Sequence, residues 1–262
     1  MSAELDLAAY LRRIGLETPP SVDLEGLRAL HLAHATSIPF ENLDIQLGLP
    51  IRLDLDSLQA KLVGRRRGGY CFEHNSLFLA VLKTLGFQVI PCEARVRLGA
   101  TEVLARTHML LLVTLAGAPW LCDVGFGGEG LLHPVPLDGR AHPQFLNTYR
   151  VAEEGRLKVL QSHRQGGWDD LYAFESESRH PIDFEMANHF TSTHPESRFI
   201  KTLTAQLPGP EVRRVLRNRA YAELRGEQVE GRELAATEVI PMLREVFGLE
   251  VPEGAQFKAL GA

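Results

Sequence analysis

Residues 67–86 read RGGYCFEHNSLFLAVLKTLG, and this stretch divides the chain into two parts of different character. Leu77, Val81 and Leu85 fall on one side of a helix from 71 to 85, and Gly86 is a typical residue to end it. The two glycines at 68 and 69 predict a sharp turn, because glycine adopts backbone angles that are closed to other residues. The helix is therefore expected to begin at about Cys71.

Before this stretch apolar residues recur at helical spacing, and after it they recur as short runs between turns. The first pattern predicts helices at 5–14, 24–35 and 56–63. The second predicts strands at 87–98, 107–115, 120–124, 149–151, 157–160 and 171–174, and a strand pair near 212–224. We interpret 181–197 as a mixed region, with His180, His189 and His194 in loops, and 237–247 as a closing helix. Helices followed by strands indicate an α+β fold.

The composition excludes several function classes. The 28 Lys and Arg against 33 Asp and Glu give a net charge of −5, which disfavours non-specific nucleic-acid binding. We see no signal peptide, and the longest apolar stretch, 77–82, is too short to cross a membrane. Three widely spaced cysteines (Cys71, Cys92 and Cys122) suggest neither a disulfide framework nor a zinc site. We therefore expect a cytoplasmic protein without a bound metal.

Cys71, His108 and Asp123 are the candidate catalytic residues. At the start of a helix the Cys71 thiol faces unpaired N–H groups and the positive end of the helix dipole, which favour the thiolate. His108 opens an apolar strand and Asp123 lies in another before a glycine turn, so each is costly to bury unpartnered. A core cysteine, a core histidine and a turn-capping acid would explain them singly. Together they supply a nucleophile, a base and a group that orients the base.

The spacing of His108 and Asp123 tests that hypothesis. If 116–119 form the hairpin turn, Asp123 pairs opposite Leu112, on the face of His108 but roughly 13 Å from it at ~3.3 Å per residue. Direct contact then needs a bulge, a different turn, or non-adjacent strands of a curved sheet. The sequence leaves these three alternatives open.

Five segments together resemble the arylamine N-acetyltransferases in their order and spacing, and the length suits the prokaryotic branch. They are SIPFENL (37–43), RGGYCFE (67–73) with Asn75, Thr107-His108, DVGFG (123–127) and STHPESRF (192–199). The resemblance implies a helical bundle at 1–86 carrying the nucleophile, a central β-barrel-like domain at 87–199 carrying the His and Asp, and a C-terminal α/β lid at 200–262. It also implies a cysteine-protease-like triad of Cys71, His108 and Asp123.

The resemblance further implies residue roles outside the triad. Glu41 and Arg67 match the family's structural ion pair, whereas His74 falls at a variable position. Apart from the resemblance, the basic run at 65–67 is most simply a solvated loop, with Arg65 or Arg66 as a candidate for contact with CoA phosphates. The positions that match ligand-contacting residues are Phe40 beside the acceptor amine, Thr107, Phe126 and Gly127 at the acetyl-CoA end of the cleft, and Phe199 near the cofactor.

The implied activity is transfer of an acetyl group from acetyl-CoA to an arylamine nitrogen, by a ping-pong mechanism through acetyl-Cys71. Hydrazines, and N-hydroxyarylamines as O-acetylation substrates, are further candidate acceptors. Two alternatives stay open: an amide synthase of natural-product biosynthesis in the same family, and a transglutaminase- or cysteine-hydrolase-like enzyme. We expect small-molecule partners, no nucleic acid and no membrane, and the sequence leaves the oligomeric state open.

Two other signals have plainer explanations. GFGGEG (125–130) fits G-x-G-x-x-G, but Pro134 and Pro136 are incompatible with the helix that would receive a pyrophosphate. His31 and His34 lack a carboxylate or cysteine at matching spacing, so we interpret them as surface or helix-face histidines and not as metal ligands.

Overall fold

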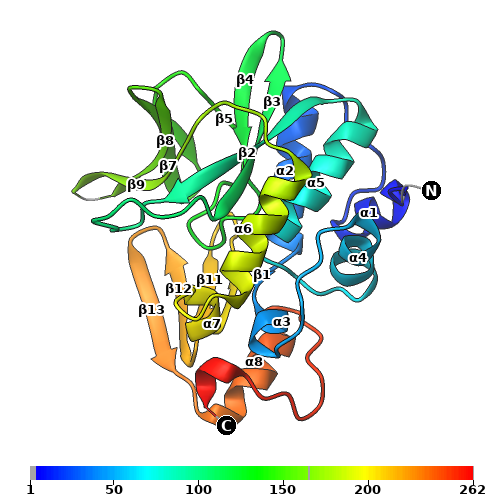
Figure 1. Cartoon of the computed structure of the whole chain (residues 1–262), viewed down its shortest axis with the longest axis vertical. Coiled ribbons are helices and arrows are strands. Elements are labelled where there is room, and N and C mark those ends of the chain that lie inside the picture. The colour runs from blue at the N-terminus through cyan, green and yellow to red at the C-terminus, as the bar shows by residue number, and fades with distance from the viewer. Residues whose placement is uncertain (1–3, 165, 262) are drawn as a thin grey trace.

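The computed structural model describes residues 4–164 and 166–261. Most N-terminal helices gather on one side, a large sheet curves over the other, and a smaller sheet lies below (Figure 1). The helices are α1 (Leu7–Arg13), α2 (Leu24–Ser37), α3 (Leu43–Gln46), α4 (Leu55–Leu58) with its π-helical continuation Gln59–Gly64, α5 (Cys71–Leu85), α6 (Pro181–Thr193), α7 (Arg198–Lys201) and α8 (Val239–Glu245), with 3-10 turns at Ala236–Glu238 and Lys258–Leu260.

The strands form two antiparallel sheets. The large sheet has the order β5-β4-β3-β2-β9-β8-β7-β6 and the small one β1-β10-β11-β12-β13. The strands of the large sheet are β2 (Gln88–Val96), β3 (His108–Leu115), β4 (Ala118–Cys122), β5 (Val135–Pro136), β6 (His142–Gln144), β7 (Asn147–Glu154), β8 (Leu157–Arg164) and β9 (Gly167–Phe174). Those of the small sheet are β1 (Phe40–Glu41), β10 (Thr204–Leu207), β11 (Arg213–Arg217), β12 (Ala220–Arg225) and β13 (Gln228–Glu233).

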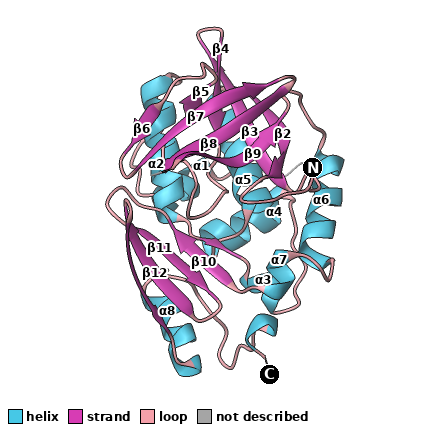
Figure 2. Cartoon of the chain, turned by 90° about the vertical axis from the view of Figure 1, so that its left-hand side faces the viewer, coloured by secondary structure: helices cyan, strands magenta, loops and turns pink. Residues whose placement is uncertain are grey.

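The large sheet curls into a nearly closed barrel above the small sheet (Figure 2). Its strand β3 is buried on both faces, which explains its continuous apolar sequence. Leu111 and Val113 pack into the cluster formed by the N-terminal helices, whereas Leu110 and Leu112 pack inside the barrel. His108 has the same parity as Leu110 and Leu112, so strand alternation places it on the barrel face. The fold is α+β, as the sequence predicts.

Helix α5 begins at Cys71 and ends before Gly86, which takes a left-handed φ of 95°. The Glu73 carboxylate accepts the Tyr70 N–H at 3.1 Å and caps the first turn. The expected reason for the glycines at 68 and 69 is wrong, because neither has a positive φ. Both are needed for close approach instead. A Cβ on Gly68 would lie 1.9 Å from the Pro39 carbonyl oxygen, and one on Gly69 2.8 Å from the Glu73 side chain.

The segment at 181–197 is where the sequence interpretation fails most clearly. It is not a mixed region but mainly helix α6, which contains His189. Pro181 stands in the first turn, and the Asp183 carboxylate accepts the His180 N–H at 2.9 Å. The apolar period is obscured because Ile182 and Met186 lie on the exposed side of α6.

Candidate active site

Cys71, His108 and Asp123 converge at one place although they come from three elements. Cys71 is the first residue of α5, His108 is the first residue of β3, and Asp123 follows the last residue of β4. His108 Nε2 lies 2.6 Å from Asp123 Oδ2. The Cys71 sulfur lies 3.7 Å from the carbonyl oxygen of Thr107, the residue before His108. All three side chains are almost completely buried.

The β3–β4 hairpin explains why His108 and Asp123 meet. The expected four-residue turn is wrong: Leu115 pairs with Ala118, so the loop is only Ala116-Gly117, with φ of 49° and 78°. Strand β4 then ends at Cys122, one residue before Asp123. The chain leaves the ladder there, and the carboxylate reaches the imidazole directly.

Neighbouring polar groups fix the orientation of Asp123. Its Oδ1 accepts hydrogen bonds from Asn75 Nδ2 and from the Gly125 N–H, both at 2.9 Å. Its own N–H donates to His31 Nε2 at 3.1 Å. Asn75 stands one turn after Cys71 on α5, so it ties the helix of the sulfur to the loop of the acid. No role was assigned to Asn75 from the sequence, although its place four residues after Cys71 on a helix is the signal for this contact.

The electrostatic balance keeps His108 charged. Burial alone would lower the pKa of its imidazole, but the Asp123 carboxylate and the Cys71 thiol raise that pKa to about 10. Burial raises the pKa of Asp123, but the His108 charge and its hydrogen bonds outweigh this and lower it. The Tyr172 ring centroid lies 4.8 Å from that of His108, and burial together with the Asp123 charge raises the pKa of its phenol well above the usual value. Tyr172 is therefore neutral beside an imidazolium–carboxylate pair.

His31 and His34 lie on α2 and are fully buried, so of the two expected placements, surface or helix face, the surface one is wrong. Burial lowers the pKa of His31 to about 4, which leaves a neutral ring able to accept the Asp123 N–H. His34 belongs to a hydrogen-bond chain that runs from Tyr10 through His34 to His74, with distances of 2.7 and 2.9 Å. His74 Nε2 lies 3.1 Å from the Pro39 carbonyl and donates to it, which orients every proton in the chain toward that carbonyl.

A buried ion network supports the loop before Cys71. Arg67 Nη2 lies 2.9 Å from both Glu41 Oε1 and Asp44 Oδ1, so the expected pair of Glu41 and Arg67 is present. Lys61 Nζ extends the network to Glu73 at 2.7 Å and to Asp44 at 2.8 Å. These contacts join β1, α3 and the π-helical turn to the first turn of α5.

A cleft of about 380 Å³ opens above the Cys71 sulfur. Besides Cys71 and His108, the predicted ligand-contacting residues that line it are Phe40, Thr107, Phe126 and Phe199. Gly127 is not among the lining residues. It has a φ of 86°, and a Cβ there would lie 2.7 Å from Gln206 Oε1. Its role in the structure is thus to let the loop after Asp123 pass close to β10.

Several lining residues were missed from the sequence, and four of them bear on substrate binding. They are Phe190, Arg198, Gln206 and Arg217. Phe190 was missed because 181–197 was interpreted as a mixed region and not as a helix. The four-residue spacing of the buried Phe184 and Asn188 is the signal that indicates α6. Gln206 and Arg217 lie in the C-terminal sheet, where no motif marks them.

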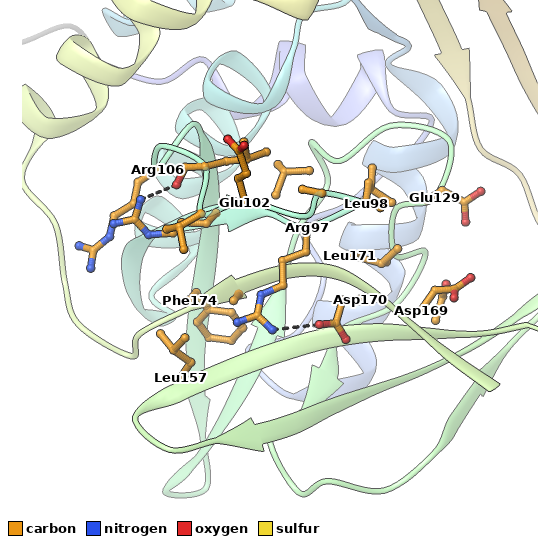
Figure 3. A pocket seen from close by; sticks show the side chains of 18 of the residues that line it. Arg97, Leu98, Glu102, Arg106, Glu129, Leu157, Asp169, Asp170, Leu171 and Phe174 are labelled. Carbon is orange, nitrogen blue, oxygen red and sulfur yellow. Dashed lines mark hydrogen bonds and ion pairs between the residues drawn. The ribbon is translucent and has the colours of Figure 1, made fainter.

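A second cavity of about 1070 Å³ adjoins the cleft. Figure 3 shows residues of this cavity, with Arg97 joined to Asp170, and with Leu98 and Glu129 among the other labelled residues that line it. The two cavities share six residues: Val96, Leu98, Leu104, Glu129, Arg198 and Arg217. A substrate larger than the cleft therefore has adjoining space.

Two further features of the described residues concern membrane-spanning helices and clusters of metal-binding side chains. Within 4–164 and 166–261, no helix is long and apolar enough to cross a bilayer. Over the same ranges, no three or more His, Cys, Asp or Glu side chains gather in a way that would hold a metal ion.

Comparisons with known proteins agree with this geometry. A family model described as N-acetyltransferase matches residues 23–256. The arylamine N-acetyltransferase of Mycolicibacterium smegmatis is 41% identical over 255 residues, which cover 94% of this chain and 93% of that protein. The Salmonella typhimurium protein named arylamine N-acetyltransferase / N-hydroxyarylamine O-acetyltransferase is 40% identical over 195 residues, or 74% of this chain and 69% of that protein.

A solved structure gives the same result in three dimensions. The structure of Mycobacterium marinum arylamine N-acetyltransferase in complex with CoA superimposes with a TM-score of 0.89 at 38% identity, covering 93% of each chain. The chain is thus similar to these proteins in both fold and sequence over nearly its whole length. The chain therefore belongs to the arylamine N-acetyltransferase family of acyltransferases.

Proposed function

We propose that this protein transfers the acetyl group of acetyl-CoA to the nitrogen of arylamines through an acetyl-Cys71 intermediate. The observation that supports the proposal most is the 2.6 Å contact of His108 with Asp123 beside the Cys71 sulfur, under a cleft lined by aromatic rings. A charged imidazole held next to a thiol favours the thiolate that attacks a thioester.

In the first half-reaction the Cys71 thiolate attacks the acetyl carbonyl carbon. A new C–S bond forms, and backbone N–H groups in the first turn of α5 stabilise the oxyanion. Collapse of the intermediate breaks the bond to CoA, whose sulfur takes the proton from the His108 imidazolium. Acetyl-Cys71 and a neutral imidazole remain.

In the second half-reaction the amine nitrogen attacks acetyl-Cys71. His108 takes the proton that the nitrogen loses, the C–N bond forms, and the Cys71 thiolate departs beside the restored imidazolium. An arylamine suits this step because its weak basicity leaves it neutral and nucleophilic at pH 7. The apolar walls of the cleft protect the thioester from water.

O-acetylation of N-hydroxyarylamines is a second candidate activity. The Salmonella typhimurium relative carries that activity in its name, and the same acetyl-Cys71 would serve an oxygen nucleophile. We propose a cytoplasmic location for both activities. Cys71, Cys92 and Cys122 are all free thiols, which is typical of proteins in a reducing compartment.

Intact-mass measurement after mixing with acetyl-CoA alone tests the proposal. We expect one acetyl adduct on the unmodified protein, its loss when an arylamine is added, and none on Cys71→Ala. Cys92→Ala is the matched control and should acetylate normally, because burial raises the pKa of that thiol to about 12. Acetate release without an amine would indicate a hydrolase, and an adduct on Cys71→Ala would refute the assignment of the nucleophile.

A further inference from the structure

Two arginines from separate elements stand where the two cavities meet. Arg198 is the first residue of α7 and Arg217 is the last residue of β11. Both line the cleft that holds Cys71, and both also line the larger cavity beside it. Each side chain is exposed, so a ligand that enters either cavity can reach it.

Neither arginine has an anionic partner within the described parts of the chain. Within residues 4–164 and 166–261, the guanidinium groups of Arg198 and Arg217 form no hydrogen bond or ion pair, although that of Arg198 lies 5.6 Å from the centre of the Phe199 ring. Two other arginines that line the larger cavity differ. Arg97 pairs with Glu154 and Asp170, and Arg106 pairs with Glu175.

The two carboxylates that line the cleft do not neutralise these arginines. Glu129 pairs with Arg164, and Glu196 pairs with Lys201. Neither of those cations lines the cleft itself. Neither acid on the cleft wall is therefore paired with Arg198 or Arg217.

The two guanidinium groups also repel each other. Crowding by protein atoms and the neighbouring Arg217 charge lower the pKa of Arg198, whereas Cys71 acts in the opposite direction. The repulsion between the two guanidinium charges is unfavourable, and an anion bound by both would relieve it. Guanidinium groups bind phosphate and carboxylate oxygens in bidentate fashion, which suits them to that role.

We propose that Arg198 and Arg217 form an anion subsite for a phosphate or carboxylate group of one of the two substrates. The source is either a phosphate of CoA or the carboxylate of an aminobenzoate-type acceptor. This assignment rests on the proposed function and goes beyond it by naming the residues that select a charged substrate. Arg65 and Arg66, the candidates from the sequence, line neither cavity.

The test compares charged and neutral substrates in each half-reaction. Arg198→Gln, Arg217→Gln and the double variant are measured with acetyl-CoA and with uncharged S-acetyl-N-acetylcysteamine, following Cys71 acetylation by mass. The acetylated enzymes are then mixed with 4-aminobenzoate and with its methyl ester. Arg219→Gln is the matched control, because this exposed arginine is near in sequence but pairs with Glu233 outside the cleft.

We expect kcat/KM for the charged substrate to fall about tenfold for each arginine, while the neutral counterpart changes less than about twofold. A loss confined to acetyl-CoA identifies the CoA phosphates as the ligand, and a loss confined to 4-aminobenzoate identifies the acceptor carboxylate. Equal losses for charged and neutral substrates, or no loss with either, would overturn the subsite. Failure of the proposed function is a separate result: the unmodified protein would then form no acetyl adduct with either donor.

Discussion

At the scale of single residues, two opposing effects determine the protonation state of His108, and the effect of Asp123 is the larger. Burial disfavours the imidazolium, yet the carboxylate at 2.6 Å raises the pKa of His108 to about 10. A raised pKa means that the pair stabilises the fold fully below about pH 6.5, and that this contribution is lost as the pH rises through 10. The charged form, which in the proposed mechanism activates Cys71, thus persists across neutral pH.

Replacing Asp123 with Asn should therefore remove both the charge and the orientation of the imidazole. We expect the rate of Cys71 acetylation to fall about 10³- to 10⁴-fold, as for orienting carboxylates in other triads. The alkaline limit of the rate should also move to lower pH, because burial then dominates the pKa of His108. Asp138→Asn is the control, since Asp138 forms a similar 2.9 Å contact with His142 at the surface. Rate constants for single-turnover acetylation from pH 6 to 10 provide the measurement, and an unchanged alkaline limit would contradict the argument.

At this scale the sequence predicts which residues are reactive better than it predicts which residues are buried. Cys71, His108 and Asp123 stand out because a reactive or charged group interrupts an apolar pattern or opens a helix. His31 and His34 lie on a helix whose pattern is only weakly amphipathic, so nothing in the sequence tells that both face inward. Their partners, Asp123 and His74, are distant in the chain, and only the fold brings them together.

At the scale of elements, the loop after Asp123 packs directly on the first turn of α5. A Cβ on Gly125 would lie 2.7 Å from Asn75 Nδ2 and 2.9 Å from the Cα of Cys71. The loop therefore has no room for a side chain at this position. This close contact adds to the hydrogen bonds of Asp123 in setting the position of the acid relative to the sulfur.

Gly125→Ala should push this loop off α5 and separate the acid from the helix of the nucleophile. Since a displacement of about 1 Å at a reacting centre can cost 10²-fold, we expect about that loss in kcat/KM. Gly64→Ala is the control, because a Cβ there meets only the Gln59 carbonyl oxygen at 3.8 Å. The measurement is acetylation kinetics, together with circular dichroism to establish that both variants are folded. Full activity in Gly125→Ala would show that the loop adapts.

Arg67 joins elements through charge instead of close packing. Replacing it with Met leaves the Glu41 and Asp44 carboxylates buried without this partner, which should cost about 3–5 kcal/mol in the free energy of unfolding. Arg232→Met breaks an exposed pair with Glu238 and should cost less than about 1 kcal/mol. Urea unfolding at pH 7 compares the two. Similar losses for both variants would mean that the buried network contributes no more than a surface pair.

Element boundaries were predictable where a strong end signal coincides with an apolar period. Helix α5 has both, and its limits match the prediction. The hairpin of β3 and β4 has an apolar period but an ambiguous turn, because Ala116 takes a left-handed φ that alanine rarely adopts. The position of Asp123 relative to His108 depended on that turn. The sequence therefore indicated that the two residues act together, but the structure was needed to show how they meet.

At the scale of the whole molecule, the N-terminal part is tied to the C-terminal sheet. Strand β1 pairs with β10, with Phe40 opposite Gln206, and it also bridges to Gly69. Three apolar clusters support the proposed division into 1–86, 87–199 and 200–262, one cluster lying mainly in each part. Phe184 of α6 nevertheless packs into the first cluster, so the parts share side chains across the proposed boundaries.

The buried histidines make the stability of the whole molecule sensitive to mild acid. Burial lowers the pKa of His31 and of His74 to about 4 and that of His34 well below its usual value, so the unfolded chain binds protons there first. Burial raises the pKa of Glu73 to about 7, so the folded protein binds a proton there before the unfolded chain does. This offsets the destabilising effect of one of the three histidines. The net sign is a loss of stability as the pH falls from about 6.5, at about 1.4 kcal/mol per pH unit for each proton that is not offset. Urea unfolding at steps from pH 7 to pH 5 measures this slope, and His189→Gln, at an exposed position, should leave it unchanged. A free energy of unfolding that stays level over this range would mean that the buried rings are already charged in the folded protein, which would contradict the neutral hydrogen-bond chain from Tyr10 to the Pro39 carbonyl.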